Sequence, residues 1–225
     1  MIGIYKTIIL SLGIIIIFIL GSLPIRGHVP ADSYRLKRST FEAETLLSKL
    51  GYWIITIDDR ADASTRHAII AFQKVEGRKR TGVLSISDLE ALRFAEAPNA
   101  RFQTAAPHVE IDLARQVLFL TDRSGAVVRI LPVSSGNEKK YFDQGKWQVA
   151  HTPRGHFQIG RKLNGVRRAS LGDLYYPNYF SSGVAIHGSN SVPAYPASHG
   201  CVRIPRFADR AFSGMVSVGT EVFVY

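Results

Sequence analysis

The chain has 225 residues with 28 basic and 18 acidic side chains, which gives a net charge of +10 at pH 7. This charge attracts polyanions, but the sequence has no zinc-finger, phosphate-loop or RNA-binding aromatic motif, so we expect the anionic cell envelope rather than nucleic acid as a partner. The single cysteine excludes a disulfide framework, and the seven histidines show no metal-ligand spacing backed by a second cysteine, so we expect no metal site.

Residues 7–25 form a nearly uncharged apolar stretch between Lys6 and Arg26. Its length is close to the ~20 residues that a helix needs to cross a bilayer. A cleaved secretory signal has a shorter apolar core and a small-x-small cleavage site, of which residues 21–23 offer only a weak version. We therefore favour an uncleaved membrane anchor in residues 1–30 over a cleaved signal, although the basic residues that follow run against the positive-inside rule. Either segment predicts a periplasmic or extracytoplasmic location.

Residues 31–96 are expected to form a small module of three helices. Apolar residues recur at near-helical spacing from Leu46 and again from Ala68. Ser64 or Thr65 is placed to cap the second helix, and a third helix is expected toward the end of the module.

Residues 97–107 contain proline, alanine and asparagine without clear periodicity, which predicts a linker. The C-terminal half, residues 108–225, contains short Val-, Ile- and Phe-rich runs separated by turn residues, at 109–113, 117–121, 127–133, 156–160, 183–187 and 220–224. These runs favour an antiparallel sandwich or open barrel. The predicted fold is therefore a mainly β domain that follows a small helical module and an N-terminal transmembrane or signal segment.

The residues that carry chemistry gather around the only cysteine. Cys201 follows Ser198, His199 and Gly200, and it lies fourteen residues after His187. A free thiol has a pKa of about 8.5, so only a few per cent of it is thiolate at neutral pH. Either histidine could take the proton and hold the thiolate by charge, because imidazole titrates near pH ~6.5.

Glycine at position 200 permits a backbone turn that residues with a Cβ avoid, so that consecutive N–H groups can converge as an oxyanion hole requires. The alternative for a lone cysteine is a small buried hydrophobe. The flanking histidines and the polar run at residues 189–191 argue against it, because a packing site does not need so many hydrogen-bonding groups. The sequence therefore favours a thiol enzyme.

A basic run without an intervening acidic residue precedes Tyr175 and Tyr176. Its members are Arg154, Arg161, Lys162, Arg167 and Arg168. The run would suit a carboxylate-bearing peptide, and the alternative is a solvated hairpin face.

The pattern IHGSNSVPAYPASHGCVRIP, at residues 186–205, resembles the active-site signature of the L,D-transpeptidase (YkuD-type) catalytic domain family. Further blocks at residues 109–118, 132–136 and 151–157 resemble successive parts of that domain. The resemblance covers about residues 107–225. It implies no metal or organic cofactor.

By position, the resemblance makes Cys201 the nucleophile, His187 the general base and the Gly188 carbonyl the group that orients the base. His199, Gly200 and Cys201 would supply the N–H groups of the oxyanion hole. The predicted substrate-binding residues are Ser189, Asn190, Ser198, Arg203 and Tyr176.

The implied reaction begins with attack of the thiolate on the bond between a diamino acid and the terminal D-alanine of a peptidoglycan tetrapeptide stem. D-Alanine leaves, and the thioester passes its acyl group to an amine on a neighbouring stem as a 3→3 cross-link. Two alternatives are a cysteine L,D-carboxypeptidase that hydrolyses the same bond and a non-catalytic cell-wall-binding protein. The pattern selects neither the acceptor nor an oligomeric state.

The N-terminal module shows a weaker resemblance to peptidoglycan-binding-like domains. The turn at residues 57–62 lacks the glycines usual there, so we weigh a binding module equally against a helical spacer that positions the catalytic domain.

Overall fold

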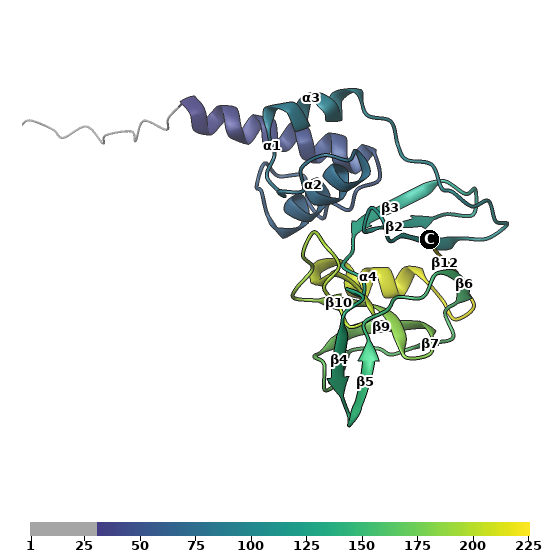
Figure 1. Cartoon of the computed structure of the whole chain (residues 1–225). Coiled ribbons are helices and arrows are strands. Elements are labelled where there is room, and N and C mark those ends of the chain that lie inside the picture. The colour runs from purple at the N-terminus through teal and green to yellow at the C-terminus, as the bar shows by residue number, and fades with distance from the viewer. Residues whose placement is uncertain (1–30) are drawn as a thin grey trace, which may run out of the picture.

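The computed structural model describes residues 31–225, with side chains from residue 39 onward. The anchor or signal predicted in residues 1–30 lies outside this range. Within the described residues, no helix is long and apolar enough to span a bilayer. Figure 1 shows a helical module at one end of the molecule and a β-rich body beside it, which confirms a mainly β domain with a helical N-terminal module.

The module contains helices α1 (Ala31–Lys49), α2 (Ala63–Val75) and α3 (Ile86–Phe94). Helix α2 is capped by Asp62, whose carboxylate accepts the Thr65 N–H, so the predicted caps Ser64 and Thr65 lie inside the helix instead. Helix α3 begins with a capping box, in which the Ser85 hydroxyl accepts the Asp88 N–H and the Asp88 carboxylate accepts the Ser85 N–H.

The glycine-free turn before α2 is held by a buried carboxylate on α1. Glu44 accepts the N–H groups of Asp58 and Asp59 at 3.0 and 3.1 Å, and the Thr65 hydroxyl donates to its other oxygen at 2.6 Å. Asp59 adopts a φ of 66°, a left-handed conformation that aspartate tolerates better than most residues. The turn therefore keeps its shape without glycine.

The first sheet has the order β3-β2-β1-β12-β6. Its strands are β1 (His108–Asp112), β2 (Val117–Thr121), β3 (Val127–Pro132), β6 (Gly155–Gln158) and β12 (Glu221–Val224). One face of this sheet packs on the module, since Phe119 and Ile130 join the same apolar cluster as Leu47 and Phe72. The other face packs on the second sheet and on helix α4 (Arg206–Met215).

The second sheet has the order β11-β10-β9-β7, and β8 also pairs with β9. Its strands are β7 (Arg161–Lys162), β8 (Val166–Arg167), β9 (Leu174–Ser181), β10 (Val184–Ser189) and β11 (Val202–Pro205). A separate hairpin is formed by β4 (Lys140–Asp143) and β5 (Lys146–Val149).

The prediction that the sheets are antiparallel holds for most pairs and is wrong for two. Strands β1 and β12 run parallel, as do β10 and β11. Parallel neighbours need a crossover connection rather than a tight turn. Between β10 and β11 this crossover is the loop at residues 190–201, which returns the chain beside β10 just as it reaches Cys201.

Helix α4 was not predicted, because the catalytic half was expected to be β. It begins after Pro205, whose φ of −60° suits a helix start, and it buries Ala208 and Phe212 in the core between the sheets. Four-residue spacing of these two positions places them on one helical face. The helix therefore joins β11 to β12 and braces the strands that carry the cysteine motif.

Lys74 connects α2 to the β domain. Its ammonium donates to the carbonyl oxygens of Gln116 and Val133, each at 2.9 Å, and its side chain is 1% exposed. Burial, together with a smaller effect of the Arg80 charge, lowers the pKa of Lys74 to about 7. One of these carbonyls belongs to Val133, two residues before Ser135. The Ser135 carbonyl in turn accepts the N–H groups of Ala197 and Ser198, in the loop that leads to Cys201.

Replacing Lys74 by alanine is expected to lower the free energy of unfolding by about 2–4 kcal/mol, because the Val133 carbonyl loses its donor, the Gln116 carbonyl keeps only the Val133 N–H, and a cavity opens. Chemical denaturation measures this change. Lys79→Ala removes an exposed lysine from the same module and should change stability by less than about 0.5 kcal/mol. Equal stability of the two variants would contradict the role assigned to Lys74.

Candidate active site

The parallel pairing of β10 and β11 brings the two signature segments together. Ile186 faces Val202 and His187 faces Arg203, so Cys201 lies one residue before the paired segment. Both segments open onto a cleft of about 900 Å³. The predicted site residues that line it are His187, Ser189, Asn190, Ser198, His199, Gly200, Cys201 and Arg203.

The turn before the cysteine is fixed by two hydroxyl groups. The Ser198 hydroxyl accepts the Gly200 N–H at 3.0 Å and donates to the Cys201 carbonyl at 2.5 Å. The Thr152 hydroxyl donates to the Gly200 carbonyl at 2.6 Å and accepts the Gly136 N–H at 2.9 Å. The Gly200 carbonyl, the Cys201 carbonyl and the Gly200 amide are therefore all hydrogen-bonded, which fixes the backbone at Cys201 before substrate binds.

Glycine is required at position 200. Its φ is +134°, a conformation that residues with a Cβ rarely adopt, and an added Cβ would lie 2.9 Å from the His151 carbonyl oxygen. The predicted backbone turn is therefore present at this residue.

His187 is oriented by its own neighbour. Its Nδ1 lies 2.8 Å from the Gly188 carbonyl oxygen, which can only accept, so Nδ1 carries the proton and Nε2 is left as the basic nitrogen. The side chain is buried, and burial lowers the pKa of His187 to about 4, with a further contribution from the Arg203 charge. The imidazole is therefore neutral at pH 7 and able to accept a proton.

Cys201 is partly exposed within the cleft. Burial of its sulfur raises the pKa of the thiol, while the Ala185 N–H and the positive charge of Arg203 act in the opposite direction. Sγ points toward the Gly183 carbonyl oxygen at 3.8 Å. The resting pair is thus a thiol and a neutral imidazole, and proton transfer must accompany attack on a substrate.

Gly188 lies against a buried carboxylate of α4. A Cβ at this position would come within 2.2 Å of Asp209 Oδ2. Arg206 Nη1 lies 3.0 Å from the same oxygen, and burial raises the pKa of Asp209. The absence of a side chain at residue 188 therefore lets α4 pack directly beneath the carbonyl that orients His187.

Gly188→Ala is expected to lower the free energy of unfolding by about 3 kcal/mol and turnover by about a hundredfold, because a shift of α4 or β10 misplaces the histidine. Stability and steady-state rates check both numbers. The matched control is Gly214→Ala on α4, where an added Cβ meets nothing within 4 Å. A Gly188→Ala variant as active as this control would refute the packing requirement.

Two predicted roles do not match the geometry. The Ser198 side chain is 1% exposed and both of its hydrogen bonds are internal, so it builds the turn rather than contacting substrate. The Gly200 N–H donates to that hydroxyl, so it does not point at an oxyanion in this structure. The amides of His199 and Cys201 are left as the candidates for that role.

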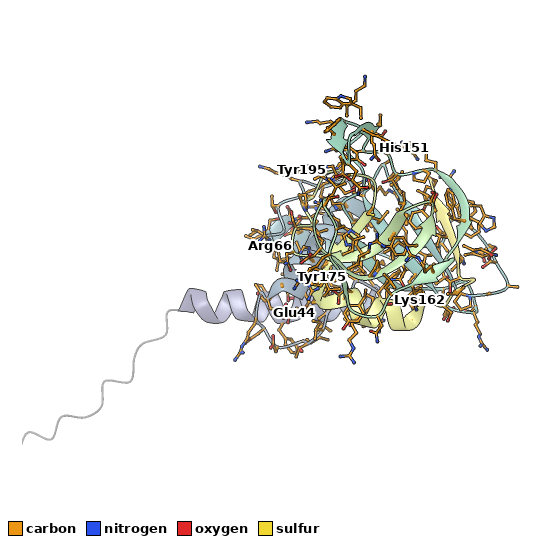
Figure 2. The ribbon with its side chains drawn as sticks, turned by 90° about the horizontal axis from the view of Figure 1, so that it is seen from below. Glu44, Arg66, His151, Lys162, Tyr175 and Tyr195 are labelled. Atoms are coloured by element: carbon orange, nitrogen blue, oxygen red, sulfur yellow. The ribbon has the colours of Figure 1, made fainter. Side chains whose placement is uncertain are left out.

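Tyr176 does not line the cleft, whereas its neighbour Tyr175 does. Tyr176 adopts a φ of 48° within β9, and its N–H donates to the Gly165 carbonyl. Side chains alternate along a strand, so only one of two adjacent tyrosines can face the cleft. Tyr175 also lies under the Arg206 guanidinium, whose Cζ is 3.4 Å from the ring centroid; Figure 2 labels this tyrosine.

The basic run divides into different roles. Arg161 and Arg167 line the cleft, and Arg161 stacks on Tyr179 at 4.0 Å. Lys162, labelled in Figure 2, instead donates to the carbonyls of Ser213 and Val216 at the end of α4. A lysine at a helix C-terminus satisfies carbonyls that lack helical partners. Only part of the run can therefore meet a substrate carboxylate.

Sequence reasoning missed three residues of the site. Thr152 anchors the turn, Asp209 supports Gly188, and the Tyr141 ring packs edge-on against His199 with centroids 4.7 Å apart. Thr152 lies in a block that carried the family resemblance, which was a usable signal. Tyr141 and Asp209 come from the unpredicted hairpin and helix. Among the described residues, no cluster of three or more His, Cys, Asp or Glu side chains could hold a metal ion.

Comparison with known proteins gives two family matches. Residues 106–224 match the L,D-transpeptidase catalytic domain, YkuD, and residues 40–92 match a putative peptidoglycan binding domain. No curated protein matches the chain.

Solved structures are also similar. One is the crystal structure of an L,D-transpeptidase from Xylanimonas cellulosilytica, with 37% identity and a TM-score of 0.76 over 83% of this chain and 92% of that one. Another is an L,D-transpeptidase (Yku) from Stackebrandtia nassauensis, with 23% identity and a TM-score of 0.47 over 83% and 90% of the two chains.

The fold and the matches define a cysteine-based, peptidoglycan-modifying enzyme. The chain belongs to the L,D-transpeptidase (YkuD) family and carries a peptidoglycan-binding domain before the catalytic domain.

Proposed function

We propose that this chain is a peptidoglycan L,D-transpeptidase that uses Cys201 as nucleophile and His187 as general base. The observation that carries the proposal is the His187 Nδ1 contact with the Gly188 carbonyl at 2.8 Å, in the same cleft as the only thiol. This contact leaves Nε2 free to exchange protons, as acyl transfer requires.

In the first half-reaction, the thiol proton moves to His187 Nε2 as Sγ attacks the carbonyl between the diamino acid and the terminal D-alanine. The oxyanion forms beside the amides of His199 and Cys201. Collapse breaks the C–N bond, and the leaving amine of D-alanine takes the proton back from His187. The product is a thioester on Cys201.

In the second half-reaction, an amine of a neighbouring stem peptide attacks the thioester carbonyl and loses a proton to His187. The thiol then recovers that proton as it leaves. Arg161 and Arg167 support binding of anionic stems, because both line the cleft and carry positive charge. Hydrolysis of the same thioester would make the chain an L,D-carboxypeptidase.

Product analysis tests this proposal. Disaccharide-tetrapeptide is incubated with the full chain, and the muropeptides are separated by mass. We expect released D-alanine together with a 3→3 linked dimer. Tripeptide without dimer, in the presence of excess acceptor amine, would instead establish the carboxypeptidase. Binding to stem peptide without either product would leave a wall-binding protein.

We further propose that residues 1–30 anchor the chain in the membrane with the catalytic domain on the extracytoplasmic face. The module at residues 31–96 would then stand between membrane and catalytic domain. The Lys74 contacts support a positioning role, because they join the module to the strand segments beside the cysteine loop. Protease accessibility in spheroplasts, compared with lysed cells, tests this orientation.

A further inference from the structure

The β4–β5 hairpin projects from the body of the molecule and pairs with neither sheet (Figure 1). Isolated two-stranded ribbons have little stability of their own. Contacts at its base hold this one, since the Ala150 N–H donates to the Lys139 carbonyl and His151 Nδ1 lies 2.9 Å from the Glu138 carboxylate. Figure 2 labels His151, which follows the hairpin at its base.

The two faces of the hairpin differ. Tyr141 and Gln148 are directly opposed and line the catalytic cleft, and Tyr141 also packs on His199. Phe142 and Trp147 form the next opposed pair, so they point to the other face. The hairpin therefore forms one wall of the cleft and presents an aromatic pair on its outer side.

Both aromatic side chains of the outer pair are exposed. Phe142 is 59% and Trp147 71% exposed, and their rings meet edge to face with centroids 5.6 Å apart. Lys140 is two residues from Phe142 on the same strand, so it shares this face, and it is exposed as well. Paired aromatic side chains left in water on a projecting ribbon indicate a binding surface rather than a contribution to folding.

We propose that the Phe142–Trp147 face binds the glycan strand of peptidoglycan by stacking its sugar rings on the two aromatic side chains. The proposal rests on the function proposed above. The face of a pyranose ring presents C–H groups, and these suit the negative face of an aromatic ring. Lys140 adds a positive charge that complements the carboxylates of the attached stem peptides.

The dimensions of the ribbon agree with this assignment. Packed sheets lie about 10 Å apart, which approximates the thickness of one ribbon with its side chains. A tetrapeptide in extended form spans about 13 Å. A stem attached to a glycan on the outer face can therefore pass the hairpin edge and reach the cleft where Tyr141 covers His199. A lipid surface would also accept aromatic and lysine side chains, but the shared wall with the cleft favours the polymer that carries the stem.

Trp147 provides a local reporter, because the only other tryptophan, Trp53, is 9% exposed. The full chain carrying Trp53→Phe, in neutral detergent, is titrated with glycan strands from which amidase has removed all peptides. Acrylamide quenching of Trp147 is followed. We expect quenching to fall on binding and Phe142→Ala to weaken apparent affinity about tenfold. Val218→Ala, which shortens an exposed apolar side chain in the loop between α4 and β12, should leave affinity unchanged.

Unchanged quenching at saturating glycan would overturn the proposal. So would a blue shift of Trp147 with phosphatidylglycerol vesicles and none with glycan, since that result assigns the face to a lipid surface. If Trp53→Phe fails to fold, co-sedimentation of glycan strands with the native chain and with Trp147→Ala gives the same comparison. Turnover of a sugar-free tetrapeptide should be equal in all hairpin variants, and its absence would count against the proposed enzyme rather than against the glycan surface.

Discussion

Cys201→Ala is expected to abolish acyl-enzyme formation and to lower turnover by about a millionfold, to the limit of detection, because the chain has no second thiol to take its place. The side chain is partly exposed, so the free energy of unfolding should change by less than about 1 kcal/mol. D-Alanine release from disaccharide-tetrapeptide measures the loss of activity. Thermal unfolding of the variant tests whether the fold is retained.

The single thiol allows a control without mutation. Cys201 is the only cysteine in the chain, so alkylation by iodoacetamide can report on this residue alone. Activity should fall in one-to-one proportion to the alkylated fraction. Bound substrate should slow both the alkylation of Cys201 and the loss of activity. Residual activity of a fully alkylated or Cys201→Ala protein would rule out thiol catalysis.

His187→Ala is expected to lower kcat/KM by about a thousandfold, because the thiol loses the base that removes its proton. The resulting cavity and the unpaired Gly188 carbonyl should also lower stability by about 1–3 kcal/mol. The matched control is His156→Ala on β6, where the imidazole contacts Glu221 and Phe223 away from the cleft. Comparable rates for both variants would remove His187 from the mechanism.

The pH dependence of the native protein should identify the same histidine. Because the pKa of His187 is lowered to about 4, kcat/KM should stay level between pH ~5 and 7 and fall only as the pH drops through about 4. An unfolded histidine titrates near pH ~6.5, so the unfolded state binds more protons between these values. Stability should therefore decrease as the pH falls from ~6.5 toward 4. An acid limb centred near pH ~6.5 would contradict the burial of the base.

Much of the architecture was predictable because it follows local rules. Strands such as those at residues 109–113 and 117–121 are short apolar runs with clear turns between them; the first is present one residue earlier and the second with the predicted bounds. The family resemblance of residues 186–205 is confirmed by the match of residues 106–224 to the catalytic domain. A nucleophile motif of this kind is recognisable because chemistry restricts the residue types at each position.

The remaining features depend on long-range contacts that single-sequence patterns do not contain. The parallel pairing of β10 with β11 is decided by the return path of a loop, and alternation was not enough to show which of Tyr175 and Tyr176 faces the cleft. Ser198 was predicted to bind substrate from its position in the motif. Its hydroxyl instead forms hydrogen bonds with the Gly200 N–H and the Cys201 carbonyl of the turn.

The most direct test is intact-protein mass spectrometry of the full chain mixed with disaccharide-tetrapeptide, followed by analysis of the products. We expect an adduct on Cys201 with the mass of the donor minus D-alanine, and then a 3→3 linked dimer as the adduct decays. An unmodified protein together with unchanged substrate, from a preparation whose thiol still reacts with iodoacetamide, would contradict catalysis by the Cys201–His187 pair.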